Sequence, residues 1–359
     1  MTRVLALVGQ AWGPGGGGIA QYNRDFLCGL ADRGCVDAIE VLPRSGPRRP
    51  ETPAKIAQRR PRYAPPIYAA GALVRALSAK WDYVFCGHLF MAPLAAMVAR
   101  LAGAKLVIQI HGVEAWTRPS ILQRVAVDGA DLVLSVSRHT RARLLDWSTI
   151  APERVAVLPD TVDESFSPGD ASVLRAAWGL TGARVLLTVG RMDGRERYKG
   201  HDRTIRALPA LTQRWPELVY VVLGEGDDRA RLERIARDEG VSEHVKFMGA
   251  VDHATLVDAY RLADAFVMPS TGEGFGIAYL EAMASGTPAI GLAAGGATDA
   301  MADGQLGVAA AESDYLERVK DALSGPRPAP QALSQAVRRR FGKAAFLAEQ
   351  RCVLERLNG

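Results

Sequence analysis

The sequence is poor in cysteine, and the cysteine spacing suggests neither a metal site nor a disulfide framework. The four cysteines among 359 residues are Cys28, Cys35, Cys86 and Cys352. Small secreted domains depend on many paired cysteines, so this pattern favours a reducing compartment. No stretch of about 20 apolar residues is available to cross a membrane, and Met1 leads directly into a predicted strand rather than into a signal peptide. We therefore expect a cytoplasmic protein.

Two familiar ligand motifs are incomplete or missing. The glycine run 13–18 after the first predicted strand contains the bare Gly-x-Gly-x-x-Gly spacing, but no acidic residue closes the second strand, because the nearest one, Glu40, lies within it. Without that acidic residue the run is not a strict dinucleotide fingerprint, which argues against a dehydrogenase. No Asp-x-Asp pair is present either, because Asp227 and Asp228 are adjacent and fit the capped start of a helix. The sequence predicts metal independence and no cofactor.

Short apolar runs alternate with helical patterns along the whole chain, as in parallel βαβ units. A chain of 359 residues with 48% hydrophobic residues is long enough for two domains with separate cores. The segment 159–182, which contains Asp160, Pro168 and Gly169, is the best candidate for a linker. We predict two Rossmann-like domains facing each other across a cleft. The strand candidates are residues 4–8, 38–42, 83–86, 105–110, 132–136, 155–158, 185–189, 220–223, 245–248, 265–268 and 289–292.

Residues 273–288 contain two glutamates, Glu273 and Glu281, eight positions apart across a glycine-marked entry into a helix. A strand precedes this segment, and the helix is expected to begin near Phe275 or Gly276. The backbone N–H groups at such a helix start suit a phosphate. At a rise of about 1.5 Å per residue the two carboxylates lie roughly 12 Å apart, which fits an extended ligand better than one reaction centre.

Two cations follow an earlier strand. The strand candidate 185–189 ends in Gly190 and Arg191, and Lys199 lies on a polar loop before the next helix. Open parallel sheets bind anions at the carboxyl ends of their strands. The guanidinium fork of Arg191 and the mobile charge of Lys199 suit a diphosphate leaving group. The loop between them also contains Arg195 and Arg197, either of which could take over part of this role.

Together these motifs resemble those of retaining glycosyltransferases of family 4, which have the two-domain GT-B fold. The matching residues are Gly190-Arg191, Lys199-Gly200, Gly224-Glu225-Gly226, Phe247-Met248-Gly249 and the segment 273–288. The resemblance implies that Arg191 and Lys199 bind the donor diphosphate. It also implies that Glu273 lies beside the donor sugar and that Glu281 hydrogen-bonds the ribose.

The same resemblance extends the candidate site. His111, at the end of the strand 105–110, would contact the donor sugar, so that Glu273, His111, Arg191 and Lys199 form the catalytic set. The glycine-rich loop after the first strand would lie over the donor phosphate and help to form the acceptor site, with Gly18, Tyr22 and Asn23 on the acceptor side. The remaining donor-binding candidates are Gly16, Gly17, Glu225, Met248, Val251, Gly274, Phe275, Gly276 and Ile277.

The resemblance also assigns the two domains. Residues 1–164 would bind the acceptor and residues 165–339 the nucleotide-sugar donor, with the last helix, about 340–359, crossing back onto the first domain. A single helical stretch is predicted over 332–358, after a cluster of prolines.

The expected reaction is transfer of a sugar from a nucleoside-diphosphate sugar, a GDP- or UDP-sugar such as GDP-mannose, to a hydroxyl of a glycan or lipid-linked acceptor. A glycosidase needs its carboxyl groups about 5 to 9.5 Å apart, less than the spacing of Glu273 and Glu281, so hydrolysis is disfavoured. Retention at the anomeric carbon is implied by the resemblance alone. Two alternatives stay open: a sugar-nucleotide epimerase of the same fold, and a binding protein that retains the donor pocket without turnover.

The net charge of +5 is unevenly distributed. Residues 44–62, from Arg44 to Arg62, contain seven basic residues against Glu51 alone, with several prolines. Such a segment could contact an anionic membrane surface at the inner face of the membrane, or a lipid-diphosphate acceptor. It could equally be a disordered, solvated loop. No motif or interleaved aromatic set supports nucleic-acid binding.

Overall fold

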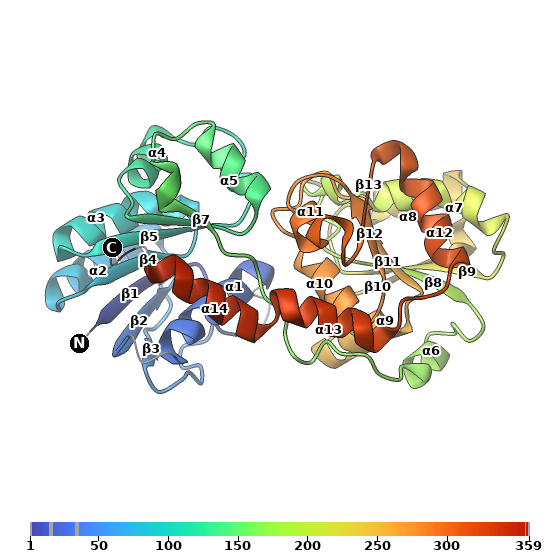
Figure 1. The fold of residues 1–359 in the computed structure, drawn as a ribbon, viewed down its shortest axis with the longest axis horizontal. Helices are drawn as coiled ribbons and strands as arrows, with labels where there is room; N and C mark the ends of the chain where they lie inside the picture. The colour runs from blue at the N-terminus through green and yellow to red at the C-terminus, as the bar shows by residue number, and fades with distance from the viewer. Residues whose placement is uncertain (1, 14–16, 33–35, 356, 358–359) are drawn as a thin grey trace. The chain divides into compact units, whose positions relative to one another are not determined.

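The computed structural model describes residues 2–13, 17–32, 36–355 and 357. The chain divides into two compact units, and we call Met1–Thr161 with Phe346–Gly359 unit 1 and Val162–Ala345 unit 2. Each unit is a parallel sheet covered by helices, as Figure 1 shows for each separately. Gly16, one of the predicted donor-binding residues, lies outside the described residues.

Unit 1 is built on a parallel sheet with the order β3-β2-β1-β4-β5-β6-β7. Its central strands are almost entirely apolar and buried, as expected for parallel strands that are covered on both faces. The order reverses between β1 and β4. The strands are β1 (Arg3–Val8), β2 (Ala38–Pro43), β3 (Ile56–Gln58), β4 (Tyr83–Cys86), β5 (Lys105–Ile110), β6 (Leu132–Ser135) and β7 (Val155–Val157).

Three helices of unit 1, α2, α3 and α4, lie side by side and share one hydrophobic core with the sheet. Alanines such as Ala72, Ala95 and Ala126 face the strands and allow close packing. The helices of unit 1 are α1 (Gly17–Asp32), α2 (Pro65–Ser78), α3 (Ala92–Ala102), α4 (Ile121–Asp128), α5 (Arg138–Leu145) and α14 (Lys343–Glu355), with short 3-10 turns η1 (Leu89–Met91), η2 (Val113–Ala115) and η3 (Pro152–Arg154).

The end of the chain differs from the single helix predicted over 332–358. It forms two helices, α13 (Pro330–Phe341) and α14, which are separated at Gly342. A Cβ atom at Gly342 would lie 2.4 Å from the carbonyl oxygen of Arg338, so the break requires glycine. The residues of α14 from Phe346 onward belong to unit 1, where Gln350 Nε2 donates a hydrogen bond of 2.8 Å to the Phe26 carbonyl.

Unit 2 contains a second parallel sheet with the order β10-β9-β8-β11-β12-β13. The strands are β8 (Arg184–Val189), β9 (Leu218–Leu223), β10 (Val245–Gly249), β11 (Ala265–Met268), β12 (Ala289–Leu292) and β13 (Val308–Ala310). The helices are α6 (Ser172–Ala177), α7 (His201–Thr212), α8 (Arg229–Asp238), α9 (His253–Leu262), α10 (Ile277–Ala284), α11 (Ala297–Ala300), α12 (Tyr315–Ser324) and α13, with 3-10 turns η4 (Arg197–Lys199), η5 (Ser242–His244), η6 (Ala302–Gly304) and η7 (Glu312–Asp314).

Two strands were not predicted, and both are three residues long. β3 lies inside the basic segment 44–62, whose charges conceal the strand pattern, and β13 lies at the far edge of the second sheet. Because β3 pairs with β2 in parallel, the basic segment is part of the sheet of unit 1 rather than a disordered loop. The predicted linker, residues 159–182, contains the short helix α6. Across the described residues, no helix combines the length and apolar character needed to cross a bilayer.

Candidate functional site

The predicted donor-binding residues of unit 2 lie on both sides of the point where the strand order of the second sheet reverses. β8 and β11 are neighbours, but the chain runs from β8 toward β9 and from β11 toward β12, in opposite directions. Arg191 and Lys199 follow β8, and Glu273 follows β11. Open α/β sheets bind ligands at the carboxyl ends of strands at such a switch point. The topology therefore brings these separated segments to one edge.

Lys199 and Glu273 are in direct contact at this edge. Lys199 Nζ lies 3.1 Å from Glu273 Oε1, and the two side chains are only 15% and 12% exposed. Burial disfavours the charge of Lys199, but the carboxylate of Glu273, with Tyr198 and Glu196, outweighs burial and raises the lysine pKa. Lys199 therefore stays protonated at neutral pH, with its charge held in place by the predicted sugar-binding glutamate.

A third acidic residue, Glu196, connects the two predicted cations. It forms an ion pair with Arg191, and its second oxygen lies 4.0 Å from Lys199 Nζ. Arg191 is 72% exposed, whereas Glu196 is 16% exposed. Sequence reasoning missed Glu196, although an acid within a loop that carries four basic residues was a usable signal. In this structure the positive charges of the edge are thus neutralised by carboxylates.

Glycines permit several close backbone contacts around this edge. A Cβ atom at Gly200 would lie 2.4 Å from the Pro269 carbonyl oxygen, and Gly200 has a positive φ of 78°. A Cβ atom at Gly224 would lie 2.1 Å from the carbonyl oxygen of Gly190. No larger residue fits without moving backbone, so these glycines bring the loops after β8, β9 and β11 together.

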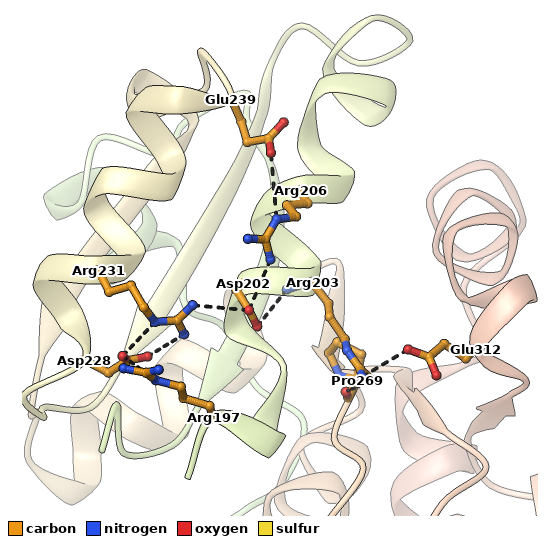
Figure 2. A network of polar contacts seen from close by, with 9 residues as sticks. All are labelled: Arg197, Asp202, Arg203, Arg206, Asp228, Arg231, Glu239, Pro269 and Glu312. Atoms are coloured by element: carbon orange, nitrogen blue, oxygen red, sulfur yellow. Dashed lines mark hydrogen bonds and ion pairs between the residues drawn. The ribbon is translucent and has the colours of Figure 1, made fainter. Parts of the chain in front are cut away.

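The loop that carries Lys199 is anchored by a network of ion pairs, shown in Figure 2. Arg197 and Arg231 both reach Asp228, at 2.9 and 2.6 Å, and Arg231 also reaches Asp202 at 3.3 Å. The hydrogen bond from Arg231 lowers the pKa of Asp228 against the opposing effect of burial. Because only 4% of the Asp228 side chain is exposed, its charge depends on these two arginines.

This network corrects one prediction. Asp228 occupies the N-cap position of α8, but its side chain makes no capping hydrogen bond. Asp227 does not cap the helix either, since its Oδ1 accepts the backbone N–H of Gly194 at 2.7 Å. The acidic pair instead ties the loop after β8 to the start of α8. Arg197 is committed to this anchor, and Arg195 pairs with Asp193.

Helix α10 begins at Ile277 after Gly276, which has a positive φ of 102° and allows the chain to turn into the helix. Glu281 lies on this helix and accepts a hydrogen bond of 2.7 Å from the hydroxyl of Tyr260. Burial raises the pKa of Glu281 to about 7, with the Tyr260 hydrogen bond opposing and the charge of Asp163 adding to the shift. The side chain stays partly exposed, so a ligand hydroxyl can still approach it.

The other predicted donor-binding residues differ in what they can offer. Phe275 is 2% exposed and its ring packs against Phe341, so it can present only backbone groups to a ligand. Glu225 is exposed in the turn after β9. Half-buried positions are found for Met248, Val251, Gly274, Gly276 and Ile277. In unit 1, Gly17 is exposed as the first residue of α1.

His201 is a buried residue of this edge to which the sequence analysis gave no role. It is 4% exposed, and its Nε2 has no hydrogen-bond partner among the residues that the structure describes. Burial, with a further contribution from Lys199, lowers its pKa to about 4. His201 is therefore a neutral imidazole, placed where a charged one would repel the lysine.

The predicted catalytic histidine of unit 1 lies at the carboxyl end of β5. His111 Nε2 lies 3.0 Å from the Gly87 carbonyl, and because a carbonyl only accepts, Nε2 carries the proton and Nδ1 is an acceptor. Burial lowers the pKa of His111 to about 4, with Glu114 opposing the shift. A second histidine, His88, stacks on it with ring centroids 5.9 Å apart. His88 was missed, although it follows β4 as His111 follows β5.

The predicted acceptor-binding side chains of α1 have structural contacts within unit 1. Tyr22 is 2% exposed and donates a hydrogen bond of 3.3 Å to the Leu158 carbonyl. Asn23 is fully buried and donates to the Gln10 carbonyl at 3.1 Å. Gly18 is exposed on the first turn of α1. Of these three residues, Gly18 alone presents an accessible surface to a ligand.

A metal site is not formed by the described parts of the chain. Within residues 2–13, 17–32, 36–355 and 357, no group of three or more histidine, cysteine, aspartate or glutamate side chains could hold an ion. The expected metal independence stays a prediction, because an ion can also be bound by a substrate diphosphate.

Comparison with known proteins gives the family. Residues 16–166 match the family model described as Glycosyltransferase Family 4, and residues 172–340 match Glycosyl transferases group 1. A GDP-mannose-dependent alpha-(1-6)-phosphatidylinositol monomannoside mannosyltransferase of Mycobacterium tuberculosis is 32% identical over 349 residues, 90% of this chain and 89% of that protein. A protein of the same description from Mycolicibacterium smegmatis is 36% identical over 260 residues, 66% of each chain. The chain belongs to glycosyltransferase family 4.

Solved structures show the same fold. Sucrose-phosphate synthase from Thermosynechococcus elongatus superimposes with a TM-score of 0.81 at 19% sequence identity, over 99% of both chains. The two parallel-sheet units therefore form the predicted GT-B fold. At this identity the likeness extends to the fold alone.

Proposed function

We propose that the protein transfers a hexosyl group from a nucleoside-diphosphate sugar to an acceptor hydroxyl, with retention at the anomeric carbon. One observation carries the proposal most directly. Lys199 and Glu273 come from loops 74 residues apart and are in contact at 3.1 Å beside Arg191, at the switch point of the second sheet. This arrangement supports the proposal, because two cations at a switch point suit a diphosphate and an adjacent carboxylate suits the sugar attached to it.

The diphosphate would take over the cations from the carboxylates that now neutralise them. Arg191 is paired with Glu196, and Lys199 with Glu273 and, more distantly, Glu196. A bound diphosphate brings two or more negative charges and fixed oxygens, and so it competes well for both cations. Glu273 is then released to accept hydrogen bonds from sugar hydroxyls and to stabilise positive charge at the anomeric carbon.

Glu281 would hold the ribose of the donor. Its pKa of about 7 means that a fraction of the molecules carry a neutral Glu281 at physiological pH. A ribose hydroxyl that donates to the carboxylate would stabilise the charged form and lower this pKa. Donor binding should therefore release protons near pH 7, which calorimetry in buffers of different ionisation enthalpy can detect.

The reaction needs no protein nucleophile. As the bond from the anomeric carbon to the phosphate oxygen breaks, the acceptor oxygen attacks from the same face and its proton passes to the departing phosphate oxygen. Arg191 and Lys199 stabilise the charge that develops on the diphosphate. His111 is neutral, and its Nδ1 can accept a hydrogen bond from a sugar hydroxyl. This role requires the neutral imidazole and not the protonated, positively charged form of His111.

The relatives suggest the first substrates to test. Both mycobacterial relatives are described as GDP-mannose-dependent phosphatidylinositol monomannoside mannosyltransferases. We therefore propose GDP-mannose as the donor and an acceptor that carries an inositol phosphate. UDP-glucose is the comparison donor, because the residues that we expect to face the base, near Met248 and Val251, do not by themselves select guanine.

The test is incubation of the purified protein with each donor, with and without the acceptor, in the presence of a chelator. Mannosyl transfer that gives an α-linked product by NMR would support the proposal and its retaining stereochemistry. A β-linked product would contradict retention. An altered sugar in the donor without acceptor would indicate an epimerase, and nucleotide binding without turnover on any acceptor would indicate a binding protein.

Lys320→Gln is a matched control for Lys199→Gln, since Lys320 forms a comparable pair with Glu317 at 2.8 Å on α12.

A further inference from the structure

Exposed apolar side chains are concentrated in unit 1. Among the described residues, Val173 and Val308 are the large exposed apolar side chains of unit 2, whereas unit 1 has many more. Most of those in unit 1 lie on or just before α2, α3 and α4: Ile67, Val74, Leu77, Phe90, Met97, Leu101, Ile121, Leu122 and Val125. We call these nine residues the apolar face. A monomeric protein in water seldom exposes a large contiguous apolar patch without a function for it.

The residues of the apolar face lie on three neighbouring helices and on the turn η1 before α3. Helices α2, α3 and α4 are neighbours and pack their inner sides into the same core (Figure 1). Their outer sides carry side chains such as Leu77 at 72% and Ile121 at 66% exposure. A surface helix normally turns polar residues outward, whereas these helices carry apolar residues on their outer sides as well as on their inner sides.

The charge on α2 and α3 has one sign. Neither α2 nor α3 contains an acidic residue, and each contains one arginine, Arg75 and Arg100. On α4, Arg124 stands against Asp128 at the last position of the helix. Apolar side chains with interspersed cations are the composition of surfaces that bind anionic lipid interfaces. A protein partner would be expected to meet charges of both signs.

An arginine-lined pocket adjoins α2 at the edge of the sheet. It has a volume of about 330 Å³ and is lined by Leu42, Pro43, Arg59, Arg60, Arg62, Tyr68 and Arg75. The pocket lies where β2 and β3 end and α2 begins, so it borders the apolar face through that helix. We call it the arginine pocket.

Glu40 compensates only part of the positive charge of the arginine pocket. Its carboxylate lies 2.9 Å from Arg59 Nε and 2.6 Å from Arg75 Nε, and 9% of its side chain is exposed. Burial opposes the charge of Glu40, but the hydrogen bonds from both arginines outweigh it and lower the glutamate pKa. Glu40 is therefore a fixed carboxylate that orients two guanidinium groups.

Arg60 and Arg62 supply charge that is not compensated. Neither has an acidic partner among the residues that the structure describes, and both are exposed. The head of Arg62 lies over α2 at Gly71, where a Cβ atom would come within 1.3 Å of Arg62 Nη1. The absence of a side chain at Gly71 thus allows this guanidinium to lie against α2 and line the pocket.

We propose that unit 1 binds an anionic phospholipid bilayer, with a headgroup phosphate in the arginine pocket and the apolar face in contact with the membrane interface. Four guanidinium groups and one carboxylate give the pocket a net positive charge that suits a phosphate. Transfer of the apolar face from water into the membrane interface is favourable because of the hydrophobic effect. The proposal goes beyond sugar transfer and does not depend on it, because it is tested without donor or acceptor.

The test is cosedimentation of the full chain with vesicles of phosphatidylcholine alone and of phosphatidylcholine with about one third phosphatidylglycerol. We expect binding to the anionic vesicles, weakened by salt, and little binding to the neutral ones. Arg60→Gln and Arg62→Gln should each reduce the partition coefficient about fivefold. Val74→Ser with Leu77→Ser should reduce it by a factor of ten or more.

Matched controls come from unit 2. Arg237→Gln removes an exposed arginine on α8, and Val173→Ser removes an apolar side chain that is 81% exposed on α6. Neither should change vesicle binding. The variants alter exposed positions, so circular dichroism should show the wild-type fold for all of them.

Four results would overturn the proposal. Equal binding to neutral and anionic vesicles would remove the role of the arginine pocket. Wild-type vesicle binding by the variant that combines Arg60→Gln, Arg62→Gln, Val74→Ser and Leu77→Ser would place any membrane contact elsewhere. Calorimetric binding of inorganic phosphate, lost in Arg60→Gln with Arg62→Gln but without vesicle binding by wild type, would mean that the pocket serves a soluble phosphate. A concentration-dependent dimer, abolished by Val74→Ser with Leu77→Ser, would assign the apolar face to a second copy.

Discussion

Glu281→Gln is predicted to stabilise unit 2 at high pH while weakening nucleotide binding. Burial raises the pKa of Glu281 to about 7 from the ordinary value of 4.5. The folded state therefore holds this proton more tightly than the unfolded state does. Glu281 contributes stability below about pH 4.5, and that contribution is lost as the pH rises to about 7. Above pH 7 the buried charge costs up to about 3 kcal/mol relative to a neutral side chain of the same shape.

Glutamine keeps the shape and an oxygen that accepts the hydrogen bond from Tyr260, so it removes mainly the charge. In urea unfolding, the free energy of unfolding of the variant should exceed that of wild type by less than about 1 kcal/mol near pH 5 and by up to about 3 kcal/mol near pH 8.5. Glu243→Gln, at an exposed position in η5, should change the free energy of unfolding by under about 0.5 kcal/mol at either pH.

Nucleotide affinity distinguishes a ribose-binding role of Glu281 from a role in protein stability alone. A ribose hydroxyl donates more strongly to a carboxylate than to an amide oxygen, so Glu281→Gln should weaken binding about tenfold near pH 8. A difference in unfolding free energy that does not vary with pH would contradict the buried acid. Unchanged nucleotide affinity in a variant that is more stable at high pH would refute the ribose contact.

Substitutions at three further positions test the other parts of the site. Lys199→Gln should lower kcat by a factor of about 100 to 1000, by removing a charge that stabilises the leaving diphosphate, while Lys320→Gln leaves kcat unchanged; equal rates for both variants would exclude the leaving-group role. Asp228→Asn should cost about 1.5 to 3 kcal/mol in urea unfolding because two partly exposed arginines lose their charged hydrogen-bond partner, and a loss under about 1 kcal/mol would show that the network of Figure 2 is not an anchor. For His111→Gln, which retains a neutral hydrogen-bonding side chain, kcat should change less than for His111→Phe; the reverse order would show that a hydrogen bond from this side chain is not used.

The sequence predicted most strands because parallel strands leave a plain signal. Strands β4, β5, β11 and β12 have the predicted bounds, and each is a short apolar run that both faces of a sheet bury. β3 and β13 were not predicted because three residues are too few to form a recognisable apolar run. In addition, β3 is surrounded by arginines, which make its segment look like a polar loop. The break at Gly342 was missed because the helical spacing continues through it, and only the position of the Arg338 carbonyl shows that glycine is required.

The candidate site was predictable to the extent that it depends on residue type at strand ends. Arg191, Lys199 and Glu273 were selected by their places after strands, and the topology brings two of those strands together. The partners of these residues were not predictable. Which carboxylate neutralises which cation depends on side-chain geometry, as the role of Glu196 shows. The burial that shifts the pKa of Glu281 likewise comes from packing, which no local pattern records.

The capping prediction at Asp227 and Asp228 failed for a related reason. An acid before a helix is a good cap when the helix end is exposed to water, but here Arg197 and Arg231 offer Asp228 stronger, charged hydrogen bonds. Of these two arginines, Arg197 lies 31 residues earlier in the chain than Asp228, beyond the reach of a local pattern. Tertiary ion pairing therefore overrode the local preference.

In the proposed function, unit 2 holds a nucleoside-diphosphate sugar between the cations after β8 and Glu281 on α10. Calorimetric titration with GDP and with UDP, without metal, is the measurement to make on wild type, Glu281→Ala and the exposed control Glu243→Ala. We expect micromolar binding of one nucleotide, weakened at least tenfold in Glu281→Ala and unchanged in Glu243→Ala. Binding of neither nucleotide, or equal binding by Glu281→Ala and wild type, would contradict it.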